Sequence, residues 1–323
     1  MAAVGLIANP LAGTDIRRLV GQASPVPMQE KVAIVRRVLK GLAGTGTETV
    51  FYLPDAAGIA EAAVNSADGA LRCEPLLMRP VGTAEDSTLA GRLLAEAGVA
   101  VIITLGGDGT NRAVAQGCRK VPLVPISTGT NNVFPTMIDG TIAGLAAGLL
   151  ATGAVDSGAV CRQTKRVEVA TADGEDFALI DAAVCRDRFT GARAVWDPRR
   201  ITAIVLARAD PWAVGLSSIG GRLRAVTDDD PFGLYVELGW GQRVTTVLAP
   251  GLVLEVPVGG WRPLALDEEV TLDVGDGTIA LDGERQLRVR GDARARVTRA
   301  GPVVVDIRGV LAAAGMHAGM HGR

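Results

Sequence analysis

Three glycines surround one carboxylate in the segment Gly106-Gly107-Asp108-Gly109, directly after an apolar run at 99–105. Because glycine has no side chain, the backbone N–H groups of such a segment can approach an anion closely. Thr110 and Asn111 follow, and residues of these types favour the start of a helix, whose N-terminus attracts negative charge. A carboxylate beside these donors suits a Mg²⁺ ligand, or a base that takes a proton from an attacking hydroxyl. We therefore predict a phosphate-binding loop with Asp108 as its catalytic base or metal ligand.

A structural alternative exists, because Asp-Gly is also a common hairpin turn. The same triplet occurs at Gly275-Asp276-Gly277, between strand-like runs at 271–274 and 278–281, and there we predict an ordinary turn. The first triplet follows a strand pattern and precedes a helix pattern. That context favours the phosphate loop.

A second polar loop follows the apolar run at 121–126. In a doubly wound sheet, the carboxyl ends of successive parallel strands lie at one edge, where ligands bind. We therefore expect both loops to face one crevice, although a loop that only caps a helix has a similar composition. The predicted cofactor-binding residues of the two loops are Gly106, Gly107, Gly109, Thr110, Asn111, Thr128, Gly129, Thr130, Asn131 and Asn132.

The elements that must position these loops alternate between strand and helix in the first half of the chain. Apolar runs at 4–9, 49–53, 71–78, 99–105 and 121–126 alternate with helical patterns at 29–43, 57–67, 85–97, 110–119 and 138–151. This order predicts an α/β fold with a doubly wound, Rossmann-like parallel sheet and helices on both faces.

The second half of the chain has a different pattern. Short alternating runs separated by Gly, Pro and Asp-Gly indicate an antiparallel β-sandwich. We predict an α/β domain over 1–155, a β-sandwich domain over 156–302, and a strand and helix over 303–323 that return to the first domain.

The composition of the chain argues against several classes of binding site and enzyme. The net charge of −2 gives no basic face for nucleic acid, and the four cysteines lack the C-x-x-C spacing of a zinc site. The two histidines, His317 and His321, lie in a glycine-rich end, so neither a Ser-His-Asp nor a Cys-His enzyme is expected. Carboxylates and bound Mg²⁺ are left to carry any chemistry.

No apolar run is as long as a membrane span, and the first residues lack the basic start of a signal peptide. We expect a cytoplasmic homo-oligomer that binds a small-molecule substrate and does not bind nucleic acid or a membrane.

The motifs resemble a known superfamily. Gly106-Gly107-Asp108-Gly109-Thr110 resembles the signature of the ATP-NAD kinases and the diacylglycerol and sphingosine kinases. Gly129-Thr130-Asn131-Asn132-Val133-Phe134 is similar to the lipid-kinase loop Gly-Thr-x-Asn-Asp-Phe, with Val133 in place of the acid. Gly215–Gly221 and Asp282-Gly283-Glu284 resemble later motifs of the superfamily. Together with Asn9-Pro10-Leu11-Ala12-Gly13, the second loop most resembles the acetoin-catabolism protein X branch.

The resemblance implies an NAD-kinase-like fold and a kinase that moves a phosphoryl group from ATP to a hydroxyl, with Mg²⁺ as cofactor and NAD as a candidate acceptor. It implies that Asp282 and Glu284 activate the hydroxyl or hold magnesium, and that Asp181 lies in the cofactor pocket. Ile180 stands where NAD kinases have asparagine, and their Thr-Pro-Thr-Gly-Ser run is replaced at 207–212.

These departures leave an alternative open, a nucleotide or NAD sensor without turnover that acts in acetoin catabolism. A lipid kinase is less favoured because no basic amphipathic helix is evident. A dehydrogenase is less favoured because no G-x-G-x-x-G follows the first strand.

Overall fold

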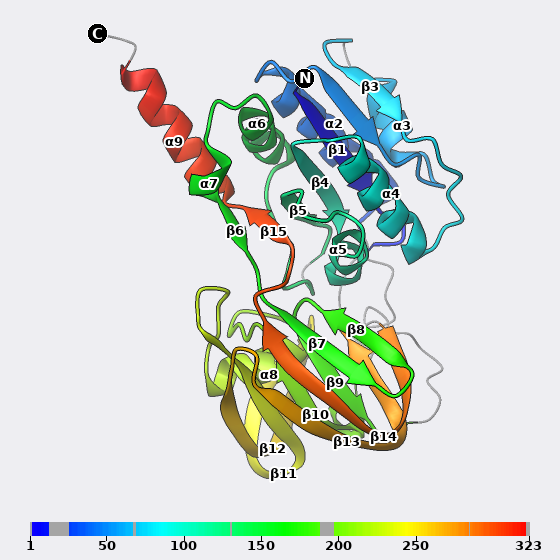
Figure 1. Cartoon of the computed structure of the whole chain (residues 1–323), viewed down its shortest axis with the longest axis vertical. Helices are drawn as coiled ribbons and strands as arrows, with labels where there is room; N and C mark the ends of the chain where they lie inside the picture. The colour runs from blue at the N-terminus through cyan, green and yellow to red at the C-terminus, as the bar shows by residue number, and fades with distance from the viewer. Residues whose placement is uncertain are drawn as a thin grey trace.

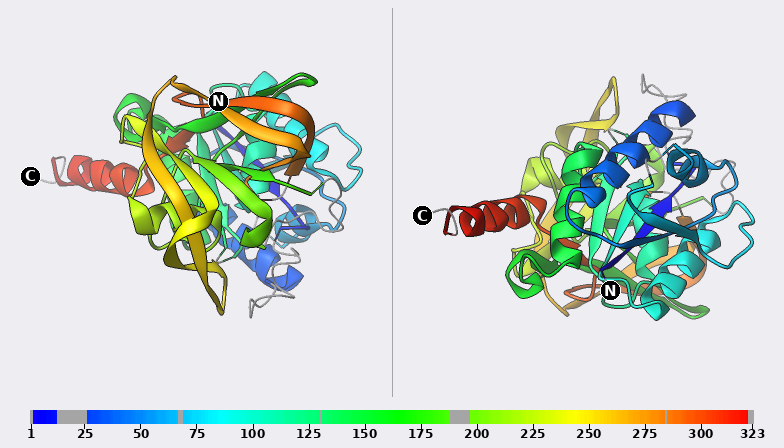
Figure 2. Two further views of the ribbon diagram at one scale, coloured as in Figure 1. Left: turned by 90° about the horizontal axis from the view of Figure 1, so that it is seen from below. Right: turned by 90° about the horizontal axis from the view of Figure 1, so that it is seen from above.

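The computed structural model describes residues 2–12, 26–66, 69–129, 131–187, 197–283 and 285–320. The chain forms an α/β domain and a β domain stacked end to end, with β6 and β15 leading from one to the other (Figure 1). Figure 2 shows that the far end of helix α9 extends beyond the rest of the molecule.

The first sheet has the strand order β3-β2-β1-β4-β5-β15-β6. All neighbours are parallel except β6, which pairs antiparallel with β15. The order confirms the predicted doubly wound sheet, and the late strand β15 completes it beside β5. The strands are β1 (Ala3–Ala8), β2 (Thr49–Tyr52), β3 (Arg72–Pro75), β4 (Val101–Gly106), β5 (Leu123–Ser127), β6 (Cys161–Gln163) and β15 (Val303–Val305).

Helices cover both faces of this sheet. One core cluster contains side chains of α2 (Met28–Ala43), α3 (Ile59–Val64) and α6 (Gly140–Ala151), and the other contains side chains of α4 (Ala84–Glu96) and α5 (Asp108–Ala115). The short helix α7 (Ser157–Val160) precedes β6, and α9 (Ile307–Met320) follows β15 and packs on α6.

The central pair β1 and β4 is the point where the strand order reverses. The helix that follows β4 is α5 on one face, whereas the first described helix after β1 is α2 on the other. Ligands of doubly wound sheets bind in the crevice outside the carboxyl ends of such a strand pair. The fold therefore directs attention to the segments after Ala8 and after Gly106.

The second domain is one antiparallel sheet of order β12-β11-β10-β9-β13-β14-β7-β8. This confirms the predicted antiparallel domain, and its strands form a single continuous sheet. The sheet curls, because Leu266 after edge strand β12 bridges to Val297 of β14. Its strands are β7 (Arg166–Thr171), β8 (Gly174–Ala178), β9 (Asp181–Cys185), β10 (Ile201–Leu206), β11 (Phe232–Ala249), β12 (Leu252–Ala265), β13 (Glu269–Leu281) and β14 (Arg285–Thr298).

Alternation along the strands divides the second core into two clusters. Ala182 and Val184 of β9 face the inside of the curl, whereas Ala183 and Cys185 face the cluster that includes α8 (Leu216–Leu223). The short 3₁₀ helix η1 (Pro198–Arg200) precedes β10.

The predicted turn at Gly275-Asp276-Gly277 is wrong. The triplet lies inside β13, where a bulge between Asp273 and Gly275 interrupts the pairing with β14. Gly275 has φ +63 and lies opposite Gly291, with φ +88, so the two strands bend here without reversing. A bulge and a turn both require glycine at positive φ, which is why the local pattern was misleading.

The chain crosses between the domains twice, at Thr164–Lys165 and at Gly301–Pro302. The Thr164 N–H donates to Pro302 O at 3.1 Å, and the Gly301 N–H donates to Thr164 O at 3.1 Å. Lys165 is fully buried and donates through Nζ to Phe232 O at 2.7 Å. Burial lowers the pKa of this ammonium to about 8, opposed by the charges of Asp228 and Asp230. Among the described residues, no helix is both long and apolar enough to cross a membrane.

Candidate active site

The first polar loop becomes the start of a helix. Gly107 occupies the N-cap position of α5, and Asp108 is its first residue. The N–H groups of a first helical turn have no partner within the helix, and Gly107 and Gly109 are only half-buried. A Cβ at Gly107 would lie 2.7 Å from Oδ1 of Asn132, so a larger residue here would displace the Asn132 side chain. Backbone donors are therefore available at the predicted crevice.

Asp108 joins the two loops. Its Oδ1 accepts hydrogen bonds from the N–H groups of Phe134 at 2.8 Å and Val133 at 3.0 Å, and Oδ2 lies 3.2 Å from the Val133 nitrogen. The side chain is buried, at 8% exposure. The carboxylate thus organises the second loop, a role that the sequence analysis did not predict.

Thr110 and Asn111 have different surroundings. Thr110 Oγ1 accepts a hydrogen bond from Nδ2 of Asn9, which follows β1, at 2.8 Å. This contact joins the segment after β1 to the first turn of α5. Asn111 is fully buried, accepts from Thr104 Oγ1 at 2.7 Å and donates to Gly107 O at 2.9 Å. Asn111 therefore holds α5 to β4.

The second loop is organised around its own side chains. Asn132 Nδ2 donates to Ser127 Oγ at 2.8 Å, and Ser127 Oγ donates to Gly129 O at 2.7 Å. Gly106 pairs with Ser127 at the end of the sheet, and Asn131 lies half-buried in the same loop. The Thr128 hydroxyl is 98% buried yet has no hydrogen-bond partner within the part of the chain that the structure describes. Thr130 lies outside the described residues.

The later acids lie at the end of the β domain that faces this loop. Asp282 accepts from the N–H of Ile180 at 2.8 Å and of Leu179 at 3.1 Å, and its own N–H donates to Asp181 O at 2.9 Å. Burial raises the pKa of the Asp282 carboxyl, while the Arg112 charge and these amides oppose the rise. Asp181 begins β9 and is buried. Glu284 lies outside the described residues.

An apolar cluster between the domains connects the backbone segments that bind Asp108 and Asp282. Phe134, whose N–H binds Asp108, packs with Leu179 and Ile180, whose N–H groups bind Asp282. Each carboxylate therefore fixes the backbone of the residues that join the domains. The roles of Asp108 and Asp282 as metal ligands stay predictions, and the hydrogen bonds given above reach both carboxylates from backbone N–H groups.

Arg112 makes a second contact between the domains. It lies one helical turn after Asp108 on α5, and its guanidinium pairs with Asp176 of β8 at 2.5 Å, donates to Phe177 O, and lies over the Phe177 ring. Both partners of the ion pair are largely buried. Helix α5 is thus fixed to the β domain by a buried charge pair.

Protein ligands for a metal are few at this site. Among the described residues, no three His, Cys, Asp or Glu side chains come together in a way that could hold a metal ion. Mg²⁺ at kinase sites is commonly held by one or two carboxylates together with substrate phosphates, and that arrangement requires no group of three protein ligands.

The buried cysteines are protonated. Burial raises the pKa of the Cys118 thiol to about 11 and of Cys185 to about 12, so these thiols are neutral near pH 7.

Three residues that hold the candidate site together were not predicted to do so. Asn9 begins the motif Asn9-Pro10-Leu11-Ala12-Gly13, but nothing in the sequence indicated a hydrogen bond to Thr110. Lys31 of α2 is buried and donates to Pro10 O at 2.6 Å and Ala12 O at 2.8 Å, which fixes the segment after β1. Arg112 follows the glycine motif directly, and its position four residues after Asp108 was the available signal.

Comparisons with known proteins divide the chain as the fold does. Residues 4–154 match the ATP-NAD kinase N-terminal domain, and residues 165–300 match the acetoin catabolism protein X C-terminal domain. The chain is 40% identical over 334 residues to acetoin catabolism protein X of Cupriavidus necator, an alignment that covers 98% of this chain and 92% of that protein.

Among solved structures, the chain aligns with a presumed diacylglycerol kinase from Bacillus anthracis at 15% identity and a TM-score of 0.46, covering 94% of this chain and 98% of the other. It aligns with an NAD kinase from Archaeoglobus fulgidus in complex with ATP at 15% identity and a TM-score of 0.40, covering 83% and 98%.

Proposed function

Because the chain belongs to the acetoin catabolism protein X family, within the superfamily of NAD kinases and diacylglycerol kinases, we propose that it is a magnesium-dependent phosphotransferase. It takes a phosphoryl group from ATP and gives it to a hydroxyl of a small molecule. The observation that carries this proposal is the start of α5, which lies beside β1 at the reversal of strand order with half-buried glycines.

The donor phosphates lie against the first turn of α5. Its backbone N–H groups and the positive end of the helix dipole stabilise negative charge there. The buried Thr128 hydroxyl supplies a further donor, and its unmet hydrogen-bonding capacity supports a ligand at this position. Bound Mg²⁺, held by the phosphates and the Asp108 carboxylate, would neutralise charge on the transferred group.

Asp108 has two further roles in this proposal. Oδ1, with its two shorter amide bonds, holds the second loop in place. Oδ2, which lies 3.2 Å from the Val133 nitrogen, is the oxygen that accepts the proton of the acceptor hydroxyl. Asp282 is a positioning residue that keeps Leu179 and Ile180 against Phe134.

The acceptor is best sought beyond NAD. Ile180 stands where NAD kinases carry asparagine, and it is 99% buried in the cluster between the domains. Its side chain has no polar group and faces other apolar residues, so it cannot hydrogen-bond a dinucleotide. The transfer assay should therefore test NAD together with other small metabolites that carry hydroxyl groups.

Calorimetry and a transfer assay test the proposal together. MgATP should bind the purified chain, and Gly107→Ala should weaken that binding at least about tenfold, because the new methyl group displaces Asn132. Gly44→Ala is the matched control, since Gly44 has φ −72 and a Cβ there meets only ordinary contacts. Equal ATP affinity in the two variants would remove the α5 crevice from the proposal.

A second candidate function is a nucleotide sensor without turnover. The observation that favours it is the engagement of the Asp108 carboxylate by two backbone amides, which suits a structural role. Radiolabelled ATP incubated with the metabolite panel separates the two candidates. Tight ATP binding without ADP or labelled product would support the sensor, and a labelled product would exclude it.

A further inference from the structure

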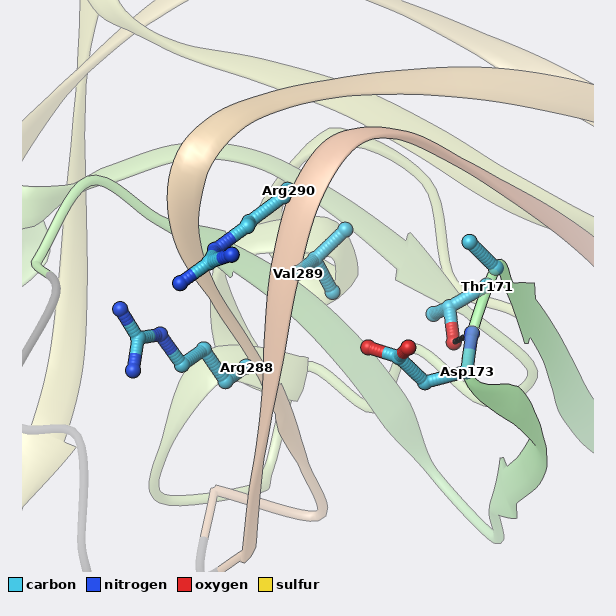
Figure 3. A pocket seen from close by; sticks show the side chains of 6 residues that line it. Thr171, Asp173, Arg288, Val289 and Arg290 are labelled. Atoms are coloured by element: carbon cyan, nitrogen blue, oxygen red, sulfur yellow. Dashed lines mark hydrogen bonds between the residues drawn. The ribbon is translucent and has the colours of Figure 1, made fainter.

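Two cavities of about 310 Å³ each lie in the described part of the β domain, outside the residues of the candidate active site. The first lies between the β7–β8 turn and β14. Figure 3 shows the guanidinium groups of Arg288 and Arg290 on the side of β14 away from Asp173, so the charged groups of this cavity do not converge on one ligand. The second cavity lies beside β12, and its lining is of a different kind.

Bulges on both β11 and β12 form the second cavity. Leu238 and Gln242 of β11 both pair with Val258, so the residues between them protrude from the strand. On β12, Gly259 is an extra residue without a partner in the described register of β11. Extra residues on both strands bend the pair and leave a hollow beside it.

Two of the four tryptophans of the chain lie at this hollow. Trp261 lines the cavity, is 42% exposed, and lies opposite Val236, whose side chain belongs to the cluster that includes α8. Trp240 lies in the β11 bulge and is 62% exposed, and its ring covers Gly259, where a Cβ would overlap the indole. Apolar surface that is exposed in one place marks a binding site.

The other walls of the cavity are aliphatic. They are formed by Leu223, the last residue of α8, and by Val244 and Val258 of the bulged strands. The Gln242 side chain adds an amide, which both donates and accepts hydrogen bonds. A few polar groups in an apolar lining of this volume are typical of a site for a small molecule.

The cavity does not favour an anionic group. None of the described residues that line it carries a charge. Glu237 alternates with Val236 and Leu238, which face α8, so its carboxylate lies on the other face of β11. A phosphate or carboxylate group would therefore lose its hydration here without gaining a partner.

The free edge of β12 does not favour a partner strand. β12 ends the strand order of the sheet, and it contains Pro257 and Pro263. A proline on an edge strand places its missing N–H on the free side, so a strand added there would lack two hydrogen bonds. A small molecule is the occupant that this surface accepts.

We propose that this cavity binds the aromatic or heteroaromatic ring of an uncharged small molecule. The ring stacks on Trp261 and packs against Val244 and Val258, because flat rings pair with indole in offset or edge-to-face arrangements. An amide or a similar polar group on the ring hydrogen-bonds Gln242. The site shares no residue with the α5 crevice, so it does not depend on the proposed phosphotransfer.

NMR titration of the full chain, followed through the indole N–H signals, tests the site. Benzamide and cyclohexanecarboxamide are the probes, because they carry the same amide on a flat and on a puckered ring. Benzamide should shift the Trp261 signal, assigned with Trp261→Ala, and should bind at least about threefold more tightly than cyclohexanecarboxamide. The signal of Trp212, which is 89% exposed outside the cavity, should not shift.

Three variants separate stacking from hydrogen bonding. Trp261→Ala should weaken benzamide binding at least about tenfold and abolish the preference for the flat ring, whereas the matched control Trp212→Ala should change neither affinity. Gln242→Leu should weaken both amides to a similar extent and keep the ratio between them, since it removes only a hydrogen bond.

Three results would overturn the proposal. They are equal shifts of the Trp212 and Trp261 signals, equal binding of the two amides to the unaltered chain, and binding of neither amide at about 10 mM.

Discussion

The two Gly-Asp-Gly triplets of this chain have the same three residues and opposite surroundings. Asp108 is buried at the start of a helix and receives the N–H groups of a loop 25 residues away. Asp276 is exposed in the middle of β13, opposite Arg290, where the strand bulges. In the first triplet glycine allows close approach of a second loop, and in the second it allows a positive φ.

The difference teaches that the neighbouring elements decide what a triplet does. An apolar strand buried on both faces precedes the first triplet, and an amphipathic helix follows it. The second lies in a strand whose described outward positions are mostly polar. The predictions below test whether the first triplet is coupled to the rest of the site and the second is not.

The largest expected effect is on the helix that the first triplet begins. Arg112→Met should lower the free energy of unfolding by about 3 to 5 kcal/mol, because it leaves Asp176 buried without its charge partner. Arg294→Met, on β14 opposite Thr271, breaks an exposed pair at 3.4 Å and should cost below about 1 kcal/mol. Urea denaturation measures both, and a double variant Arg112→Met with Asp176→Asn should recover part of the loss.

The acids of the two triplets should differ in activity. Asp108→Asn should lower turnover at least about a hundredfold, whereas Asp276→Asn should stay within about twofold of the unaltered chain. A fall in turnover with unchanged ATP affinity indicates proton transfer, and a parallel loss of ATP affinity indicates that Asp108 acts through the second loop. Comparable turnover in both variants would contradict the distinction between the triplets.

Replacing Gly107 or Gly275 with alanine should affect different properties of the protein. Gly275→Ala should lower the free energy of unfolding by about 1 kcal/mol, since φ +63 is unfavourable for alanine while nothing lies within 4 Å of the new Cβ. ATP affinity should not change. Thermal melting and calorimetry on this variant, beside Gly107→Ala, check the contrast, and a loss of ATP affinity in Gly275→Ala would break it.

The last prediction concerns the crossing that joins the two regions, where the expected effect depends on pH. Because the pKa of buried Lys165 is about 8 in the folded chain and 10.5 when exposed, the unfolded chain binds more protons between these values. Stability contributed by this residue should therefore rise from pH 8 to 10.5 and fall as the pH drops through 8. Denaturation measures the free energy of unfolding of the unaltered chain and of Lys165→Met across this range. The unaltered chain should gain stability relative to Lys165→Met as the pH rises.

Much of the α/β domain could be predicted, because each of its central strands is an unbroken apolar run followed by a helical pattern. The runs at 99–105 and 121–126 lie within one or two residues of β4 and β5. The position of the first loop followed from this order alone. The curled sheet of the β domain could not be predicted in the same way, since alternation predicts strands but not which strands pair.

The partners of Asp108 were beyond local reasoning. From the local sequence, a carboxylate at the start of a helix is equally consistent with an anion site and with a helix cap. Its actual contacts are with the N–H groups of Val133 and Phe134, which the fold brings from the segment after another strand. The bend at Gly275 depends likewise on Gly291 across the sheet. Contacts of this kind come from tertiary structure, which a single local pattern does not contain.

The late strand β15 has a consequence for how the protein is made. A ribosome releases the whole β domain before it releases Val303–Val305, so the edge of β5 lacks this partner until the β domain has been made. A transcript truncated before codon 303 would yield chains with an open strand edge, which favours aggregation in the cell.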